Sequence, residues 1–259
     1  MFKHLIYEIK DGICTISLNR PEVYNALHLP LIQEITKAFL QASDDSFVRV
    51  VVLTGMGDKA FCSGADLRNG MNNPMSLGDS LRSGYNPMIL SIRNLEKPVI
   101  CRLNGIAAGA GCSLALACDV IIASETARMS QIFVSIGLII DAGSSYFLPR
   151  LLGSQKAFEL ASTGRIVEAK ECLELGLVSK VVPATELDFV VNQTAKMYAK
   201  SATKAIGLIK KVLNQSHHST LEQMLELEAI NQDIAGKTND FVEGVSAFLG
   251  KKLPDFKGI

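Results

Sequence analysis

Two segments rich in glycine and alanine stand where core positions would ordinarily carry branched side chains. They are residues 61–67 (FCSGADL) and residues 104–114, the second at a predicted helix start after a predicted strand. Small residues let a ligand approach the backbone closely, and a helix start presents unpaired N–H groups with a partial positive charge. Two such bends could form an oxyanion hole. Either segment alone could equally serve close packing of a helix on a strand.

Asp141 is the candidate base. It follows the five residues 136–140, four of which are branched aliphatics. An apolar wall disfavours the charged carboxylate and raises its pKa towards the range that suits a general base. The competing interpretation is a helix N-cap, because Asp141 also precedes a helical pattern over residues 144–152. From the residues alone the N-cap is the better supported of the two.

The elements that must position these groups follow a repeating β/α pattern. Alternating or continuous apolar runs predict strands over residues 13–18, 48–53, 98–103, 120–123 and 178–182. Helical spacing predicts helices after Pro30, within residues 107–118, and in succession over residues 185–250. Residues 70–84 contain Asn, Pro, Met and Ser and are expected to form a mobile loop. This order of elements predicts an α/β fold with a helical C-terminal region.

Composition excludes several classes of protein. Lys+Arg and Asp+Glu are equal at 26 each among 259 residues, so no nucleic-acid partner is expected. The doublets Lys210-Lys211 and Lys251-Lys252 are interpreted as solvated helix faces. Six scattered cysteines without a CxxC pair favour the reducing cytoplasm. Apolar stretches such as residues 106–117 are too short to span a membrane, and His28, His217 and His218 lack partners for a metal site, so no metal is assigned.

The order of motifs resembles the crotonase, or enoyl-CoA hydratase/isomerase, superfamily. The resembling segments are residues 18–21, 25–27, 61–67, 97–100, 104–119, 137–152, 169–182 and 248–256. The resemblance implies a crotonase-like spiral of ββα units over residues 1–199, and a C-terminal helical trimerisation and oligomerisation region over residues 200–259. It also implies an acyl-CoA thioester as substrate, with CoA belonging to the substrate and no separate cofactor. The implied assembly is a homotrimer or a homohexamer, a dimer of trimers.

The resemblance also implies roles for individual residues. The N–H groups of Ala65 and Ala110 match the two oxyanion-hole donors, although family members often have Gly at the second position. The two glutamates of the family's hydratases match Ser113 and Phe133, neither of which can act as a carboxylate base. Some isomerases of the family have an aspartate at the position of Asp141, and this favours the base over the N-cap.

Further residues are candidates for binding the substrate or its CoA: Ser63, Asp66, Leu67, Gly109, Phe133, Phe248 and Lys251. Asp66 is expected to orient its loop by accepting backbone N–H bonds. By resemblance, Phe248 and Lys251 match residues that reach the CoA of a neighbouring subunit, with a solvated surface lysine as the alternative for Lys251. Weaker candidates for the acyl pocket, or for packing alone, are Tyr24, Met71, Met75, Leu81 and Tyr85.

The expected activity is that of an acyl-CoA isomerase with one aspartate base. It would shift a double bond from β,γ to α,β, or rearrange a ring-epoxide CoA ester. Residues 131–134 and 147–150 resemble the ring-epoxide isomerase subgroup of bacterial phenylacetate degradation. Two alternatives stay open: an enoyl-CoA hydratase that activates water by other means, and a non-catalytic acyl-CoA-binding protein of the same fold.

Overall fold

The computed structural model describes residues 2–70 and 75–259, and its strands within these residues form two sheets. The larger sheet has the order β1-β2-β3-β5-β7-β10 and the smaller has the order β4-β6-β8-β9. The strands of the larger sheet are β1 (Leu5–Lys10), β2 (Ile13–Leu18), β3 (Val50–Gly55), β5 (Val99–Leu103), β7 (Val120–Ser124) and β10 (Lys180–Val182). Those of the smaller sheet are β4 (Ala60–Cys62), β6 (Ile106–Ala108), β8 (Arg128–Ser130) and β9 (Ile166–Glu168).

The chain alternates between the two sheets as it advances. From β3 to β8, consecutive strands enter the larger and the smaller sheet in turn, and the pairs β3–β5, β5–β7, β4–β6 and β6–β8 are parallel. Antiparallel pairing occurs at the outer strands, between β1 and β2 and between β8 and β9. This alternation is the spiral of ββα units, so the predicted fold class is confirmed.

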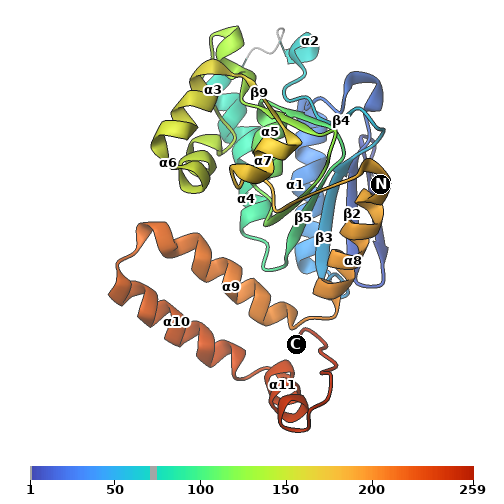
Figure 1. Cartoon of the computed structure of the whole chain (residues 1–259), viewed down its shortest axis with the longest axis vertical. Coiled ribbons are helices and arrows are strands. Elements are labelled where there is room, and N and C mark those ends of the chain that lie inside the picture. Colours follow the sequence, from blue (N-terminus) through green and yellow to red (C-terminus); the bar gives the residue numbers. More distant parts are fainter. Residues whose placement is uncertain (1, 71–74) are drawn as a thin grey trace.

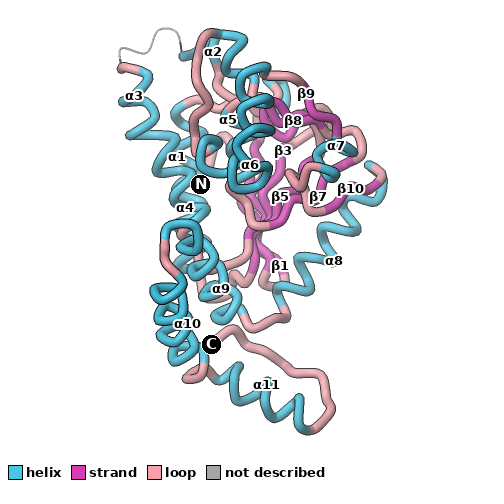
Figure 2. Tube along the Cα trace, turned by 60° about the vertical axis from the view of Figure 1, so that its left-hand side comes forward, coloured by secondary structure: helices cyan, strands magenta, loops and turns pink. Residues whose placement is uncertain are grey.

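Helices cover both faces of the larger sheet (Figures 1 and 2). They are α1 (Leu29–Asp44), α2 (Leu67–Gly70), α3 (Leu77–Ser80), α4 (Asn86–Arg93), α5 (Ala110–Leu116), α6 (Ser144–Thr163), α7 (Ala169–Glu174), α8 (Leu187–Ala199), α9 (Thr203–Gln215), α10 (Leu221–Ala235) and α11 (Asn239–Leu249). One face of α1 buries Leu31, Ile35 and Phe39 in the main core. On the other face of the sheet, Leu187 and Val191 of α8 pack in a second, smaller cluster.

Two predictions made from the sequence are wrong. Residues 75–84 do not form an open loop, because Ser76 caps α3 by accepting the Asp79 N–H at 3.0 Å and a π-helical turn over Leu81–Tyr85 continues into α4. Met71 lies outside the described residues.

The second error concerns Lys210, which was interpreted as part of a solvated helix face. It is buried on α9, where its ammonium bonds to Asp119 at 2.8 Å and to the Ile92 carbonyl at 2.9 Å.

The helices α9, α10 and α11 extend away from the sheets (Figure 1). Their exposed large apolar side chains are Ile209, Leu213, Leu221, Leu225, Ile230, Ile234, Phe241, Val242, Val245, Phe248 and Leu249. Among the described residues, none of the helices has the length and apolar character that crossing a bilayer requires. In this single chain the C-terminal region therefore exposes many large apolar side chains to solvent.

Candidate active site

The first glycine-rich segment is held by a short stretch of parallel pairing. Leu27 donates its N–H to the Gly64 carbonyl at 2.7 Å and accepts the Asp66 N–H at 2.8 Å, which makes a bridge between Leu27 and Ala65. In such a bridge the flanking groups face the partner, so the N–H of Ala65 itself faces the other way. Within residues 2–70 and 75–259, that N–H has no hydrogen-bond acceptor.

The second segment forms the turn from β6 into α5. Gly109 lies at φ +53°, donates its N–H to Ser130 at 2.9 Å, and precedes Ala110, the first residue of α5. The Ala110 N–H belongs to the first helical turn, which has no acceptor inside its own helix, and none is found elsewhere in the described residues. The main chain at this position is helical, a conformation that Ala adopts as readily as Gly, so the N–H donor is kept where family members often have Gly.

The two turns touch each other because β4 and β6 are paired. Gly64, at φ +92°, leaves no room for a side chain: a Cβ there would lie 2.6 Å from the Ala108 carbonyl oxygen and 3.4 Å from the Ala110 nitrogen. Only glycine permits this approach. Ala65 and Ala110, which are 45 positions apart in the sequence, therefore present two unpaired N–H groups in one part of the molecule.

Asp141 lies between the 3-10 turn Ile132–Ile136 and α6, and the N-cap interpretation is wrong. The N-cap of α6 is Gly143, and no side chain caps that helix. The Asp141 Oδ1 atom is buried and has no hydrogen-bond partner among the described residues. Burial raises the pKa of this carboxyl from 3.8 to about 6. A carboxylate with this pKa is ionised at neutral pH and still basic enough to accept a proton.

Other candidate side chains lie beside Asp141 or beside the second turn. Phe133 is buried, and its ring lies 3.9 Å from where a Cβ of Gly109 would be. Ser113 is fully buried, and its hydroxyl donates to the main-chain carbonyl of Asp141 at 3.0 Å. Burial and the negative charge of Asp141 both raise the pKa of Tyr85, with smaller contributions from Cys62 and Asp66. Tyr85 therefore lies within electrostatic range of Asp141.

The ion pair between Arg20 and Asp66 stabilises the first turn. Arg20 Nη2 lies 2.8 Å from Asp66 Oδ2, and Arg20 Nη1 donates to the Ala26 carbonyl at 2.5 Å. The two side chains are 11% and 6% exposed. Sequence reasoning assigned no role to Arg20. The signal that could have found it is Asp66 itself, because a carboxylate expected inside the fold requires a cationic or N–H partner.

The remaining candidates fall into two groups. Ser63 lies beside the first turn, with its N–H donating to the Tyr24 carbonyl at 3.0 Å, and Leu67 begins α2 with a half-exposed side chain. Phe248 is 83% exposed near the end of α11, and Lys251 is exposed just beyond that helix. Figure 1 shows α11 and α2 at opposite ends of the molecule. A single chain therefore does not bring Phe248 and Lys251 to the two turns.

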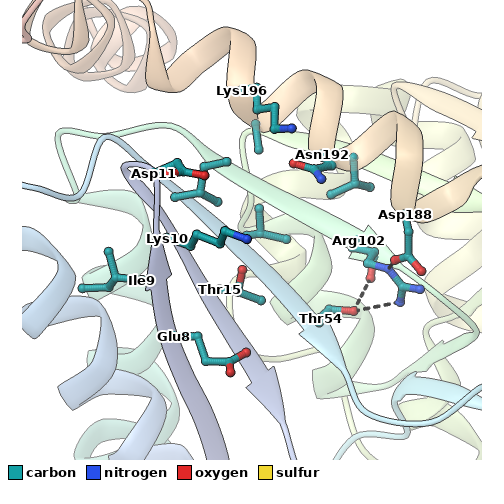
Figure 3. A pocket seen from close by; sticks show the side chains of 14 residues that line it. Glu8, Ile9, Lys10, Asp11, Thr15, Thr54, Arg102, Asp188, Asn192 and Lys196 are labelled. Carbon is teal, nitrogen blue, oxygen red and sulfur yellow. Dashed lines mark hydrogen bonds and ion pairs between the residues drawn. The ribbon is translucent and has the colours of Figure 1, made fainter.

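A separate groove of about 590 Å³ lies between the outer face of the larger sheet and α8 (Figure 3). Arg102 pairs there with Asp188 at 2.6 Å and donates to Thr54 at 3.2 Å. The other charged side chains that line it are of both signs: Glu8, Lys10, Asp11 and Lys196. None of the candidate site residues lines this groove. In the part of the chain that the structure describes, no group of three or more His, Cys, Asp or Glu residues is arranged for a metal ion.

Comparison with known proteins gives full-length matches. The family model described as enoyl-CoA hydratase/isomerase matches residues 8–259. The 1,2-epoxyphenylacetyl-CoA isomerase of Escherichia coli strain K12 is 37% identical, over 100% of both chains. The trans-2-decenoyl-(acyl-carrier-protein) isomerase of Streptococcus mutans is 33% identical, over 99% of both. The crystal structure of an enoyl-CoA hydratase from Bacillus anthracis superposes with a TM-score of 0.92 at 35% identity, covering 99% of this chain and 100% of that one.

Proposed function

Because the chain belongs to the enoyl-CoA hydratase/isomerase family, we propose that it is an acyl-CoA isomerase with Asp141 as its single base. The observation that carries the proposal is the buried Asp141 carboxylate, with its pKa raised to about 6. The two positions that the resemblance assigns to hydratase glutamates are Ser113 and Phe133, which cannot ionise as carboxylates. A single base suffices for a proton shift, whereas activation of water ordinarily requires more help.

In the proposed mechanism, the N–H groups of Ala65 and Ala110 bind the thioester oxygen of the substrate. Asp141 removes a proton from C2 of a 3-enoyl-CoA, and the electron pair moves through the thioester to give an enolate oxygen. The two N–H groups stabilise this charge, and in other enzymes one such donor contributes about 2.7 to 4 kcal/mol. The protonated Asp141 then returns the proton to C4, which leaves the double bond between C2 and C3.

A ring-epoxide CoA ester is the second substrate to test. It also has a carbon next to the thioester carbonyl, so the same base and the same N–H groups can act on it. The similarity to the Escherichia coli isomerase supports this choice. Phe133, Gly109 and Leu67 would line the space beside the reacting carbons.

The hydratase alternative is supported by the similarity to the Bacillus anthracis enzyme. It would require Asp141, or a group not yet identified, to activate water. The test is to measure 3-enoyl-CoA isomerisation and crotonyl-CoA hydration in parallel with the wild-type and Asp141→Asn proteins. Isomerisation without hydration, lost in the variant, supports the proposal. Dominant hydration would reassign the reaction, and acyl-CoA binding with no proton exchange would favour a non-catalytic protein.

We also propose that residues 200–259 form the oligomerisation region of a homotrimer or a dimer of trimers, with residues 1–199 as the core. The exposed apolar side chains of α9, α10 and α11 support this proposal. Phe248 and Lys251 would then reach the CoA bound to a neighbouring subunit, while Ser63 and Asp66 would lie near the CoA of their own. The proposed reaction needs no cofactor, because CoA is part of the substrate, and the expected location stays cytoplasmic.

Sedimentation tests the assembly. We expect the wild type to sediment as a trimer or a hexamer, and Phe248→Glu to shift it towards the monomer, because a charge would be buried at the contact. Phe158→Glu is a matched control, since Phe158 is also exposed but lies on α6. A monomeric wild type would contradict the proposed assembly.

A further inference from the structure

Among residues 2–70 and 75–259, no donor forms a hydrogen bond to the carboxylate of Asp141, and its Oδ1 atom is buried. A base must lie within a few tenths of an ångström of its working position for efficient proton transfer. The direction of this side chain therefore depends on how firmly its main chain is fixed.

The main chain of Asp141 is fixed by two buried serines. Its carbonyl oxygen accepts the Ser113 hydroxyl at 3.0 Å and the Ser144 N–H at 3.0 Å. The two serine hydroxyls lie 2.7 Å apart, and both residues are 0% exposed. Each hydroxyl has one proton, so Ser144 donates to Ser113 when Ser113 donates to Asp141. Such a chain of hydrogen bonds strengthens each of its members.

The same serine connects Asp141 to the second turn. Ser113 is the fourth residue of α5, which begins at Ala110. Its N–H donates to the Gly109 carbonyl at 3.1 Å, and its hydroxyl lies 3.3 Å from that same carbonyl. One side chain therefore spans from the turn that carries the Ala110 N–H to the turn that carries the candidate base.

The turn after Asp141 depends on such outside support. Ala142 lies at φ +48° and Gly143 at φ +88°. L-residues such as alanine rarely adopt this left-handed conformation, and it persists where surrounding contacts enforce it. The serine pair is a contact of this kind, and it introduces no charge beside the carboxylate.

We propose that Ser113 and Ser144 are positioning residues for the base: their buried hydroxyl pair fixes the main chain of Asp141 relative to the Gly109–Ala110 turn. This inference rests on the proposed function for its catalytic consequence. The geometric part, that the pair controls the surroundings of the Asp141 carboxylate, can be tested without turnover.

The kinetic test uses Ser113→Ala, Ser144→Ala and the double variant. We expect kcat for 3-enoyl-CoA isomerisation to fall about 10- to 100-fold while KM changes less than about threefold, because the substrate contacts remain and the base is displaced. The double variant should lose little more than the worse single variant, since both hydroxyls act in one chain. Ser124→Ala is the matched control: Ser124 is 1% exposed and its hydroxyl lies 2.8 Å from that of Thr126. It should change kcat by less than about twofold.

The second readout is the pKa of Asp141, measured by NMR on protein with carboxyl-labelled aspartate and assigned by the signal missing from Asp141→Asn. We expect about 6 in the wild type and in Ser124→Ala, and a lower pKa in both serine variants, because a loosened turn admits water to the carboxylate. An unchanged pKa and an unchanged kcat in Ser113→Ala and Ser144→Ala would overturn the inference. If the wild type turned over no acyl-CoA while the serine variants still lowered the pKa, the proposed function would fail and the positioning role would stand.

Discussion

The two sides of the candidate site are held by opposite kinds of interaction. The turn that carries Ala65 is fixed by the buried ion pair of Arg20 and Asp66, with 2.8 Å between its atoms. The turn that carries Asp141 is fixed by neutral hydroxyls, those of Ser113 and Ser144. The first side supplies an N–H group, whose hydrogen-bonding capacity does not depend on a pKa. The second supplies a carboxylate, and a guanidinium beside it would lower the pKa that a base requires.

This difference shows where an ion pair can support a turn and where a neutral contact is needed. An ion pair gives a rigid support, but it imposes an electric field on its neighbours. A hydroxyl pair supports the main chain with little effect on ionisation. The predictions below either break this division of roles or make it quantitative.

The largest effect is expected from removing the base. Asp141→Asn keeps the size of the side chain and removes its basicity, so turnover of 3-enoyl-CoA should fall by about a hundredfold or more. Acyl-CoA should still bind, because the N–H groups of Ala65 and Ala110 are unchanged. Steady-state kinetics and calorimetric binding measure the two quantities. A variant that kept its rate would show that another group is the base.

Removing the Arg20–Asp66 ion pair should lower both the free energy of unfolding and kcat/KM. Arg20→Met leaves Asp66 without its guanidinium partner, and loss of one member of a buried pair typically destabilises a protein by about 3 to 5 kcal/mol. We expect kcat/KM to fall by about tenfold or more as the Ala65 turn loosens. Urea unfolding and initial rates give the two values.

Arg93→Met is the control for that variant. Arg93 pairs with Asp119 at 3.0 Å, with side chains 24% and 20% exposed, and it does not contact the Ala65 turn. It should lower the stability with a smaller change in kcat/KM. Equal rate losses in the two variants at equal destabilisation would refute a specific role for Arg20.

The pH dependence of kcat/KM reports on the uncharged surroundings of Asp141. Because burial raises the pKa of Asp141 to about 6, and because the base must be ionised, kcat/KM should fall about tenfold per pH unit below pH 6 and reach a plateau above it. A profile measured with 3-enoyl-CoA at constant ionic strength gives the inflection. An inflection near pH 4 would mean that the carboxylate is solvated and that the neutral surroundings have no effect.

The smallest effect concerns stability. The Asp141 pKa is raised from 3.8 in the unfolded chain to about 6 in the folded one, so the folded protein binds more protons in this interval. Stability should therefore fall as pH rises from about 4 to about 6, and the penalty is fully present above pH 6. Asp141→Asn removes it, so thermal unfolding should show the variant gaining stability relative to the wild type between pH 4.5 and pH 7. A difference that did not vary with pH would contradict this assignment.

Local signals were enough to predict much of the fold. The alternation over residues 13–18 matches β2 (Ile13–Leu18), and the apolar run at 120–123 matches β7 within one residue. The two glycine-rich bends were also visible, because a close approach of backbones excludes side chains whatever the rest of the chain does. The strands β1 and β9 were not predicted. β9 has only three residues, too few to show a periodicity, and β1 is an outer strand with one buried residue, so pairing to a neighbouring strand decides it.

The amino-acid sequence by itself determined the order of most strands of the larger sheet, the helical C-terminal region, the two bends with small residues, and the identity of the carboxylate that follows an apolar segment. Only the tertiary structure decided which polar groups meet: Arg20 with Asp66 across 46 positions, and Ser113 with Ser144 across 31. It also decided that Lys210 is buried and that Gly143 replaces Asp141 as the N-cap. The physical reason is that periodicity and propensity describe how a segment interacts with its own neighbours, whereas a buried hydrogen bond is specified by two segments that the fold brings together.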